Sequence, residues 1–335
     1  MIEIEGSYGE GGGQIVRTAV ALSAVTGKAV EINNIRKNRP KPGLKAQHLV
    51  SLKTAAWLCK AQVSGLMLGS TELSFSPVEI EGGDLEVDIG TAGSITLLLQ
   101  GLMPALPFAK KEVQLRIRGG TDVAWAPSID YLQQVTLKAL RKMGYGCELE
   151  LQKRGYYPKG GGVVTATFKP CKLKSFHFLR EEKREEGKIF GISHSSNLPS
   201  HVAERQAEAA KASLFKAGFS SKIKSESSNF FSTGSGISLW TGFFGGTALG
   251  KPGLLAEKVG CKAAKEILPE LKSKASVDVY LADQLIPYMA LAGESSYTVR
   301  KLSQHTKTNI WVTEQFLDVK FRIKKTEKGF EVSVD

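Results

Sequence analysis

Cysteine is scarce in this chain, and its positions do not suggest chemistry. The 335-residue sequence holds four cysteines, and they lie far apart, at Cys59, Cys147, Cys171 and Cys261. None stands in a Cys-x-x-Cys pair or at zinc-ligand spacing from a histidine, so neither a zinc site nor a disulfide framework is indicated. We expect all four to be structural residues, with Cys59 packing as a small hydrophobic side chain in a helix.

Long apolar runs are also lacking. No segment approaches the ~20 apolar residues that span a bilayer, and residues 1–10 (MIEIEGSYGE) lack the basic and apolar pattern of a secretory signal. We therefore expect a cytoplasmic protein with no membrane partner. At roughly 100–200 residues per domain, the length favours two domains.

Acidic residues are outnumbered by basic ones. The chain has 45 Lys and Arg against 33 Asp and Glu, a formal net charge of +12. Basic side chains that neutralise phosphates release counterions, which drives binding to nucleic acids. The excess favours a polyanionic partner, although part of it is scattered lysine, as in the tail residues Lys320, Lys324, Lys325 and Lys328.

Strand-like and helix-like segments repeat in order along the chain. Residues 2–5 (IEIE) alternate, a glycine-rich loop follows, and apolar residues then recur at helical spacing up to Gly27. A similar order begins at residue 85. In the last unit we expect strands at 276–281, 309–313 and 317–323, and helices near 284–292 and 297–304. Units of ~60–80 residues packed side by side are indicated.

A stretch of mixed charge divides the chain. Residues 179–188 (LREEKREEGK) are typical of a boundary, and the block after them has its own long helix at 201–217. We expect an α+β fold of α/β-like repeats. A discontinuous large domain (1–184 plus 274–335) would consist of the repeated units, and a smaller α/β domain (185–273) would be inserted into it.

The first candidate for chemistry is the loop of residues 9–14 (GEGGGQ). Its glycines let the backbone approach a ligand, and the helix N-terminus that follows favours an anion. The loop lacks the Gly-Lys-Ser/Thr ending of a P-loop and does not complete Gly-x-Gly-x-x-Gly. A tight strand-to-helix turn would explain the glycines equally well. Glu10 is a candidate metal ligand, and Arg17 lies one helical turn further on.

A basic loop follows the second strand. Arg36, Lys37, Arg39, Lys41 and Lys45 surround two prolines. Arginine can bind a phosphate through two parallel hydrogen bonds, and proline stiffens the loop that carries it. Solvated charge is the alternative. Gln47 and His48 begin the next helix, where His48 is as well explained by the edge of the core as by catalysis.

Other polar loops have simpler explanations. Ser94 in GTAGS could cap a helix or bind a phosphate, and capping is the simpler explanation. Asp122 in GGTD could cap a helix or contact a metal, and residues 154–162 (RGYYPKGGG) are expected to form a turn between strands. We expect His305 to end a short helix just before a strand. There it could act as a neutral nucleophile, or simply bond the last carbonyls of the helix.

Taken together, these strings resemble the RNA 3′-terminal phosphate cyclase family. The most specific match is RGYYPKGGG, joined in order by GEGGGQ, IRKNRPKPGL with Gln47 and His48, GTAGS, GGTD, ADQ at 282–284 and HTKTN at 305–309. The resemblance covers essentially the whole chain and is weakest in residues 185–273. It implies repeated units of a four-stranded sheet with two helices, interrupted by a small α/β domain.

The resemblance also implies a reaction. A histidine attacks the α-phosphate of ATP and carries AMP, the RNA 3′-phosphate takes the AMP, and the 2′-hydroxyl closes a 2′,3′-cyclic phosphate. By matched position, His305 would be the nucleophile and Glu10 the ligand of a divalent metal, Mg²⁺ or Mn²⁺. Phosphates would be held by Arg17, Arg36, Arg39 and Gln47. The adenosine pocket would be framed by Gln100, Pro127, Tyr280, Asp283 and Gln284.

Three other functions compete with this one. A non-catalytic relative that binds during ribosome assembly would lack the nucleophile, whereas His305, Glu10 and Arg17 are all present. An enolpyruvyl transferase is built from similar repeats but needs no nucleoside pocket. A plain RNA-binding module fits the net charge, but neither an RRM aromatic string nor a KH Gly-x-x-Gly setting is evident. The partner we expect is RNA with a 3′-terminal phosphate, with no obligate protein partner.

Overall fold

The computed structural model describes residues 1–179, 188–327 and 329–335. The charged stretch that we expect at the domain boundary, 179–188, therefore lies almost wholly outside the described residues.

The first repeat has the order strand, helix, strand, helix, strand, strand. Its elements are β1 (Ile2–Glu5), α1 (Gly13–Thr26), β2 (Val30–Asn33), α2 (Ala46–Cys59), β3 (Gln62–Ser64) and β4 (Leu73–Ser76). The sheet order is β1-β2-β4-β3, and β1 and β2 are parallel. Because α1 and α2 each follow one strand of this parallel pair, the loops that lead into both helices leave the same edge of the sheet.

The second repeat has the same plan, with a shorter first helix and a second helix that contains a π-helical segment. Its elements are β5 (Gly83–Asp88), α3 (Ile95–Leu102), a 3₁₀ turn (Leu106–Phe108), β6 (Val113–Gly119), α4 (Ile129–Tyr131), a π-helical segment (Leu132–Thr136), α5 (Leu137–Lys142), β7 (Gly146–Lys153) and β8 (Gly162–Lys169). The order β5-β6-β8-β7 matches that of the first sheet, again with the first two strands parallel.

The last repeat lacks its first full strand. Its elements are α8 (Val279–Ala292), β13 (Ser295–Val299), α9 (Gln304–Phe316), β14 (Phe321–Thr326) and β15 (Gly329–Val334), in the sheet order β13-β15-β14. A single parallel bridge from Val277 to Val299 stands where the other repeats have their first strand. The expected four-stranded sheet is therefore reduced to three strands and one bridge.

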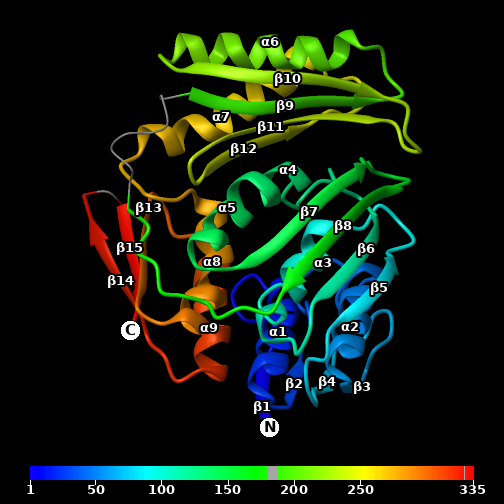
Figure 1. The fold of residues 1–335 in the computed structure, drawn as a ribbon, viewed down its shortest axis with the longest axis vertical. Helices are drawn as coiled ribbons and strands as arrows, with labels where there is room; N and C mark the ends of the chain where they lie inside the picture. The colour runs from blue at the N-terminus through cyan, green and yellow to red at the C-terminus, as the bar shows by residue number, and fades with distance from the viewer. Residues whose placement is uncertain (180–187, 328) are drawn as a thin grey trace.

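The block between the second and last repeats forms a sheet of different order. Its elements are β9 (Lys188–Ser196), α6 (His201–Lys216), β10 (Ser220–Ser228), β11 (Gly234–Thr241), β12 (Phe244–Leu249) and α7 (Ala256–Lys272), with the sheet order β10-β9-β11-β12. It stands at the top of the molecule in Figure 1. This block has a core cluster of its own, which includes Ile189, Leu214 and Ile267, whereas one core joins the three repeats. The two cores support the division into 1–184 plus 274–335 and 185–273, which we retain as a proposal.

Three predicted elements of the last repeat are wrong. The strand expected at 276–281 is only the Val277 bridge, because the Asp278 side chain caps α8. The helix expected near 297–304 is largely β13, and the strand expected at 309–313 belongs to α9. His305 therefore lies in the first turn of a helix and not at the end of one.

The reason for the last error lies in α9. Ser303 caps it by accepting a hydrogen bond from the Thr306 backbone N–H. The sequence Asn309–Thr313 is rich in β-branched side chains, which favour strands. The buried residues nevertheless recur at helical spacing, at Thr306, Asn309, Ile310 and Thr313, where α9 packs on α1 and α8. Tertiary packing overrides the local preference for a strand.

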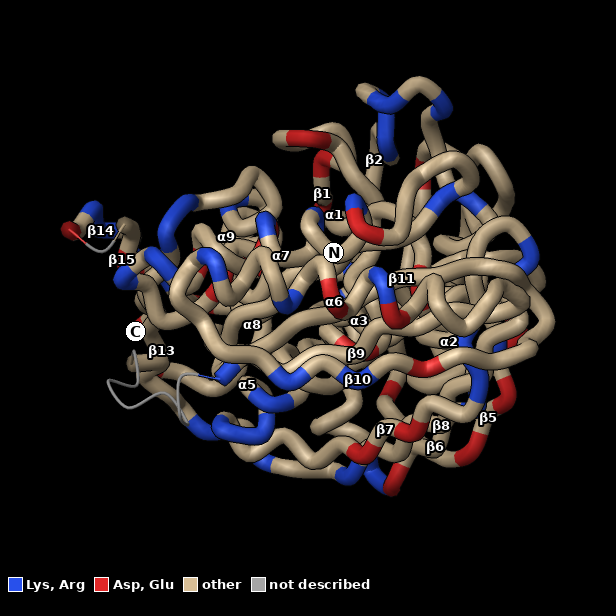
Figure 2. The backbone as a smooth tube through the Cα atoms, turned by 90° about the horizontal axis from the view of Figure 1, so that it is seen from above, with Lys and Arg blue, Asp and Glu red and all other residues tan. Residues whose placement is uncertain are grey.

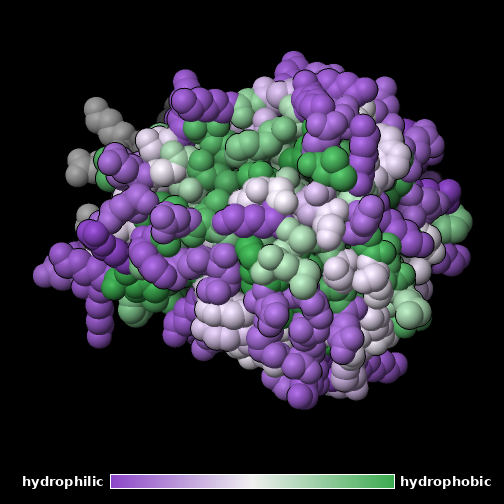
Figure 3. Space-filling model, turned by 90° about the horizontal axis from the view of Figure 1, so that it is seen from below, coloured by the Kyte–Doolittle hydropathy of each residue, from purple (hydrophilic) through white to green (hydrophobic). Residues whose placement is uncertain are grey.

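Helices α1, α8 and α9 lie between the sheets of the repeats, as Figure 1 shows. Seen from below, hydrophilic residues surround the molecule and hydrophobic ones gather toward the middle of the face (Figure 3). Within the described residues, no helix is long and apolar enough to cross a membrane.

Asp278 joins three parts of the fold and is fully buried. Its Oδ1 accepts hydrogen bonds from Leu281 N–H and Tyr131 O–H, both at 2.7 Å, and its Oδ2 accepts from Gly245 N–H at 2.8 Å. We expect Asp278→Ala to lower the free energy of unfolding by about 3 kcal/mol, because three buried donors lose their acceptor. Urea denaturation measures this, and Asp318→Ala, at an exposed position, is the control.

Asp278→Asn extends this test to pH. Burial raises the pKa of Asp278 to about 7, despite its three hydrogen bonds. The folded state therefore holds a proton that the unfolded chain releases near its ordinary pKa, and stability should fall as pH rises from about 4 to 7. The fall should be smaller in Asp278→Asn. Identical pH profiles for the two proteins would contradict this assignment.

Candidate active site

The N-terminal turns of α1 and α9 meet at the strongest candidate site. Gln14 is the second residue of α1, and His305 is the second residue of α9. The Gln14 amide Nε2 donates to the backbone carbonyl of His305 at 3.0 Å, and its Oε1 contacts the ring Nδ1 of His305. The amide oxygen beside Nδ1 favours the tautomer that carries its proton on this ring nitrogen. The Nε2 of His305 is left with a free electron pair.

Two charged side chains flank the free face of the His305 ring. Glu10 Oε2 lies 3.4 Å from His305 Nε2 and 3.5 Å from Arg39 Nη2. Burial lowers the pKa of His305 below its ordinary value; Glu10 opposes this shift, and the charges of Arg17 and Arg39 reinforce it. The ring is therefore neutral at physiological pH, as a nucleophile must be.

A second set of contacts holds α9 against α1 and α8. Thr18 Oγ1 donates to Asn309 Oδ1 at 2.8 Å, and Asn309 Nδ2 donates to the Asp283 carbonyl at 2.7 Å. Burial lowers the pKa of Arg17 to about 10, and the charge of Asp283 partly offsets this effect. Burial also raises the pKa of Asp283, with Arg17 acting against it. Arg17 and Asp283, predicted to bind phosphate and adenosine, are thus electrostatic neighbours.

The start of α2 packs against the glycine loop through His48. A Cβ on Gly13 would lie 2.3 Å from His48 Nε2, so only glycine fits there. His48 Nδ1 accepts a hydrogen bond from the Lys45 backbone N–H at 3.1 Å. Burial lowers the pKa of His48 to about 3, with help from the charges of Arg17, Arg36 and Lys45. Of the two explanations open for His48, the structural one is supported.

Gln47 connects α2 to α3. Its Oε1 accepts a hydrogen bond from the Ser94 backbone N–H at 3.1 Å, and the Ser94 hydroxyl caps α3 by accepting from Leu97 N–H. The predicted capping role of Ser94 is confirmed. The first turns of α1, α2, α3 and α9 thus form a continuous chain of neighbours, from His305 through Gln14, Gly13, His48 and Gln47 to Ser94.

Arg36 is turned toward its own loop. Its backbone has a left-handed conformation (φ 55°), and its Nη1 donates to the carbonyls of Lys41 and Gly43, both at 2.8 Å. These bonds close the basic loop, which projects beside β2 in Figure 2. Arg36 therefore shapes the loop that positions Arg39, and its own role as a phosphate ligand stays a prediction.

The residues expected around adenosine make fewer contacts with the helix starts around His305. Thr96 Oγ1 donates to the Pro127 carbonyl, and Thr136 Oγ1 donates to Gln284 Oε1 at 2.9 Å. Tyr280 is 55% exposed in the first turn of α8, and Gln100 is half-buried on α3. Among the described residues, no hydrogen bond or ion pair ties Gln100, Pro127 or Tyr280 to His305.

Glu10 suits a divalent metal in one respect. Its carboxylate is exposed on a glycine loop beside Arg39 and His305. Mg²⁺ is usually bound through one or two carboxylates together with substrate phosphates, and seldom by a full cage of protein ligands. A single carboxylate at a phosphate-suited site matches that pattern.

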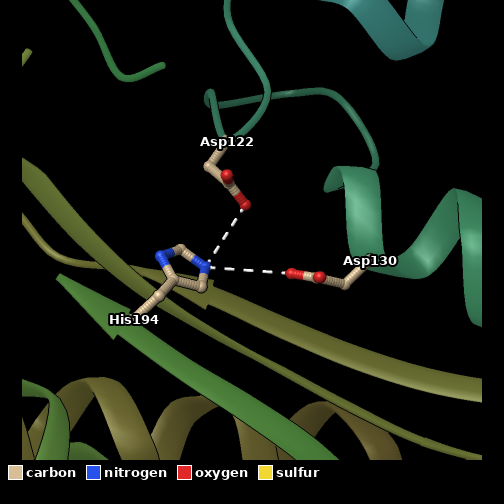
Figure 4. A group of neighbouring side chains, drawn as sticks. All are labelled: Asp122, Asp130 and His194. Carbon is tan, nitrogen blue, oxygen red and sulfur yellow. Dashed lines mark ion pairs between the residues drawn. The ribbon is translucent and has the colours of Figure 1, made fainter. Parts of the chain in front are cut away.

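A second polar cluster lies where the inserted block meets the second repeat. His194 on β9 faces Asp122 and Asp130, as Figure 4 shows, with its Nε2 3.3 Å from Asp122 Oδ1 and 4.0 Å from Asp130 Oδ2. Arg154 donates to Asp130 through two nitrogens, at 2.8 and 3.0 Å, and lies 3.3 Å from Asp122. The Tyr156 hydroxyl lies 2.8 Å from His194 Nδ1.

The cluster of Asp122, Asp130 and His194 has the residue types of a metal site, but Arg154 already supplies its cation. Arg154 is buried and pairs with both carboxylates. Burial opposes the charge on Asp122, yet His194 and Arg154 outweigh it and lower the pKa of Asp122. A divalent ion would have to enter beside a fixed guanidinium. We therefore assign the cluster to holding the inserted block on the second repeat.

Sequence reasoning missed several of these partners. Three of them lie inside the sequence motifs GEGGGQ, HTKTN and RGYYPKGGG: Gln14, Asn309 and Arg154. The motifs predicted no role for these residues, because each contacts a residue distant in the chain. Asp130 and His194 carry no local signal, since each lies in an ordinary helix or strand.

Repeated units bring helix N-termini together beside a neutral histidine, an arrangement that suits a phosphorylated ligand. The family model of RNA 3′-terminal phosphate cyclase matches residues 8–323. The chain belongs to this family, and it is an enzyme.

The curated relatives agree over the full length. Proteins named RNA 3′-terminal phosphate cyclase from Methanosarcina acetivorans and Methanosarcina barkeri are 67% and 68% identical to this chain, with all of each chain covered. A protein of the same name from Archaeoglobus fulgidus is 52% identical, over 97% of this chain and 99% of its own.

Gly13 offers a test of the packing beneath the site. Alanine is the better helix residue, so propensity alone would predict that Gly13→Ala stabilises α1. Because its Cβ would meet His48, we instead expect a loss of about 1–3 kcal/mol in the free energy of unfolding. The double variant Gly13→Ala/His48→Ala should recover part of it. A stabilised single variant in urea denaturation would contradict the close contact.

Proposed function

We propose that this enzyme converts an RNA 3′-terminal phosphate into a 2′,3′-cyclic phosphodiester at the expense of ATP, through AMP bound to His305. The observation that carries the proposal is the meeting of helix N-termini at this histidine. α1, α2, α3 and α9 begin next to one another, and the first residues of a helix offer unpaired N–H groups and a partial positive charge. Such a place suits a triphosphate and a terminal phosphate together.

The first step needs a neutral nucleophile held in one orientation. The Gln14 contacts keep the proton on Nδ1, so Nε2 can attack the α-phosphate of ATP. The P–N bond forms as the bond to pyrophosphate breaks. Arg39 and Arg17 lie close enough to affect the pKa of His305, and they would stabilise the charge that develops on the phosphoryl oxygens.

The next steps move AMP and close the ring. An oxygen of the RNA 3′-phosphate attacks the AMP phosphorus, the P–N bond breaks, and His305 is regenerated. The neighbouring 2′-hydroxyl then attacks the activated 3′-phosphorus, and AMP leaves. Ring closure needs little beyond positioning, because the hydroxyl is already tethered beside the phosphorus.

The remaining predicted residues complete the proposal. Gln100, Pro127, Tyr280, Asp283 and Gln284 would frame adenosine, and the exposed ring of Tyr280 offers a stacking face. Glu10 would hold a divalent ion, Mg²⁺ or Mn²⁺, and the ion would neutralise charge on the phosphates. We further propose that the enzyme acts in the cytoplasm without an obligate protein partner.

Labelling with ATP tests the nucleophile. With α-labelled ATP and a divalent metal, the wild-type protein should take up an acid-labile phosphoramidate label. His305→Ala should take up none, because the described residues place no other imidazole with a free Nε2 at this site. Gln304→Ala, at the exposed first residue of α9, is the matched control and should still be labelled. Label on the His305→Ala protein would show that the nucleophile is a different residue.

Metal titration tests Glu10. Even outer-shell partners of metal ligands are worth about 10- to 100-fold in affinity, so Glu10→Ala should raise the Mg²⁺ concentration for half-maximal labelling at least about tenfold. RNA binding, measured by fluorescence anisotropy without ATP, should stay largely intact. Glu3→Ala removes an exposed carboxylate on nearby β1 and serves as the control. An unchanged Mg²⁺ titration would show that Glu10 does not bind the metal.

A further inference from the structure

Three large aromatic side chains are exposed on loops at one end of the second sheet. Trp125 is 98% exposed, Tyr157 is 78% exposed and Phe231 is 62% exposed. Trp125 follows β6, Tyr157 lies between β7 and β8, and Phe231 lies between β10 and β11. Exposed aromatic residues that share one region of the surface indicate binding more often than packing. The proposed reaction gives none of these three side chains a role.

Direct contacts join the three loops. Lys159 Nζ lies 5.7 Å above the ring of Phe231. The Ser232 hydroxyl donates to the Gly160 carbonyl at 2.7 Å and accepts from the Tyr156 N–H at 2.8 Å. The Gly155 carbonyl accepts hydrogen bonds from Thr121 and Asp122, where the loop of Trp125 begins. We call Trp125, Tyr157 and Phe231 the aromatic surface.

Part of the aromatic surface rests on a buried ion network. Residues 154–162 have a buried half, where Arg154 and Tyr156 join the cluster of Asp122, Asp130 and His194, and an exposed half with Tyr157 and Lys159. Trp125 has a left-handed backbone (φ 61°), which bulky residues rarely adopt outside functional sites. Rings presented on a fixed backbone lose little entropy when they bind.

Loop contacts link the aromatic surface to the helix starts around His305. A Cβ on Gly160 would lie 2.6 Å from the Thr91 carbonyl, and one on Gly93 would lie 3.5 Å from the Gln47 side chain. Two glycine contacts therefore connect the loop of residues 154–162 to α2, whose first turn adjoins the site of His305. A chain whose 3′-phosphate lies at His305 could extend across these loops without leaving the protein.

We propose that the aromatic surface, with Lys159, stacks the last unpaired nucleotides of the RNA substrate. Successive bases stacked on aromatic rings, with a cation near the backbone, are the usual way of holding a single strand without reading its sequence. Bases paired in a duplex do not present their faces in this way. The enzyme would thus favour single-stranded 3′ ends whatever their sequence. This inference rests on the proposed function.

Substrate length provides the test. KM is measured for a single-stranded RNA of roughly ten nucleotides and for a dinucleotide, both with a 3′-phosphate. Trp125→Ala and Tyr157→Ala should each raise KM for the longer RNA about tenfold, the scale of one lost stacking contact, with a much smaller change for the dinucleotide. Tyr157→Phe keeps the ring and should restore the wild-type value. Phe215→Ala, 82% exposed on α6, is the matched control.

Formation of enzyme–AMP, which needs no RNA, is measured in the same samples. If the wild-type protein forms none, the proposed function fails. If it forms enzyme–AMP and the variants keep the wild-type KM for the longer RNA, the stacking surface alone is wrong. The stacking proposal would also be overturned by equal changes in KM for both RNA lengths or by a raised KM for ATP. A changed sedimentation mass with unaltered RNA kinetics would overturn it too, because the aromatic surface would then mediate contacts between copies of the chain.

Discussion

The contact between the Gln14 amide and His305 is the interaction on which the site depends. It joins the first turn of α1, near the start of the chain, to the first turn of α9, near its end. One amide contacts the backbone of α9 and the ring nitrogen at once, so it positions the histidine and favours the tautomer with a free Nε2. The Thr18–Asn309 pair holds the same two helices one turn further on.

Repetition of one topology explains why so many loops meet there. In each repeat the helices follow parallel or bridged strands, so the connecting loops leave the sheet on one edge. Glycines then allow close approach that a side chain would hinder, as at Gly13 against His48 and Gly160 against the Thr91 carbonyl. The result is a small region where helix N-termini are neighbours although their residues are almost 300 positions apart in sequence.

The loop of residues 154–162 has two roles, one buried and one proposed at the surface. Arg154 neutralises two buried carboxylates at the junction with the inserted block, which would otherwise be costly to bury. The same loop carries Tyr157 and Lys159 to the surface. A buried ion network beneath an exposed binding loop is a physical reason for a string that combines arginine, aromatic residues, proline and three glycines.

The sequence alone determined the α+β class, the repeated units, most elements before residue 275 and the strings that indicate the family, because these depend on local periodicity and on residue types at short spacing. Only the tertiary structure decided that residues 309–313 are helical, that His48 and Arg36 stabilise loops, and that His194 meets Asp122 and Asp130. Each of these depends on a partner distant in the chain. His305 belongs to both groups. The motif HTKTN predicted it as the nucleophile, whereas its neutral ring and the free Nε2 that Gln14 favours depend on burial and on a contact distant in the chain.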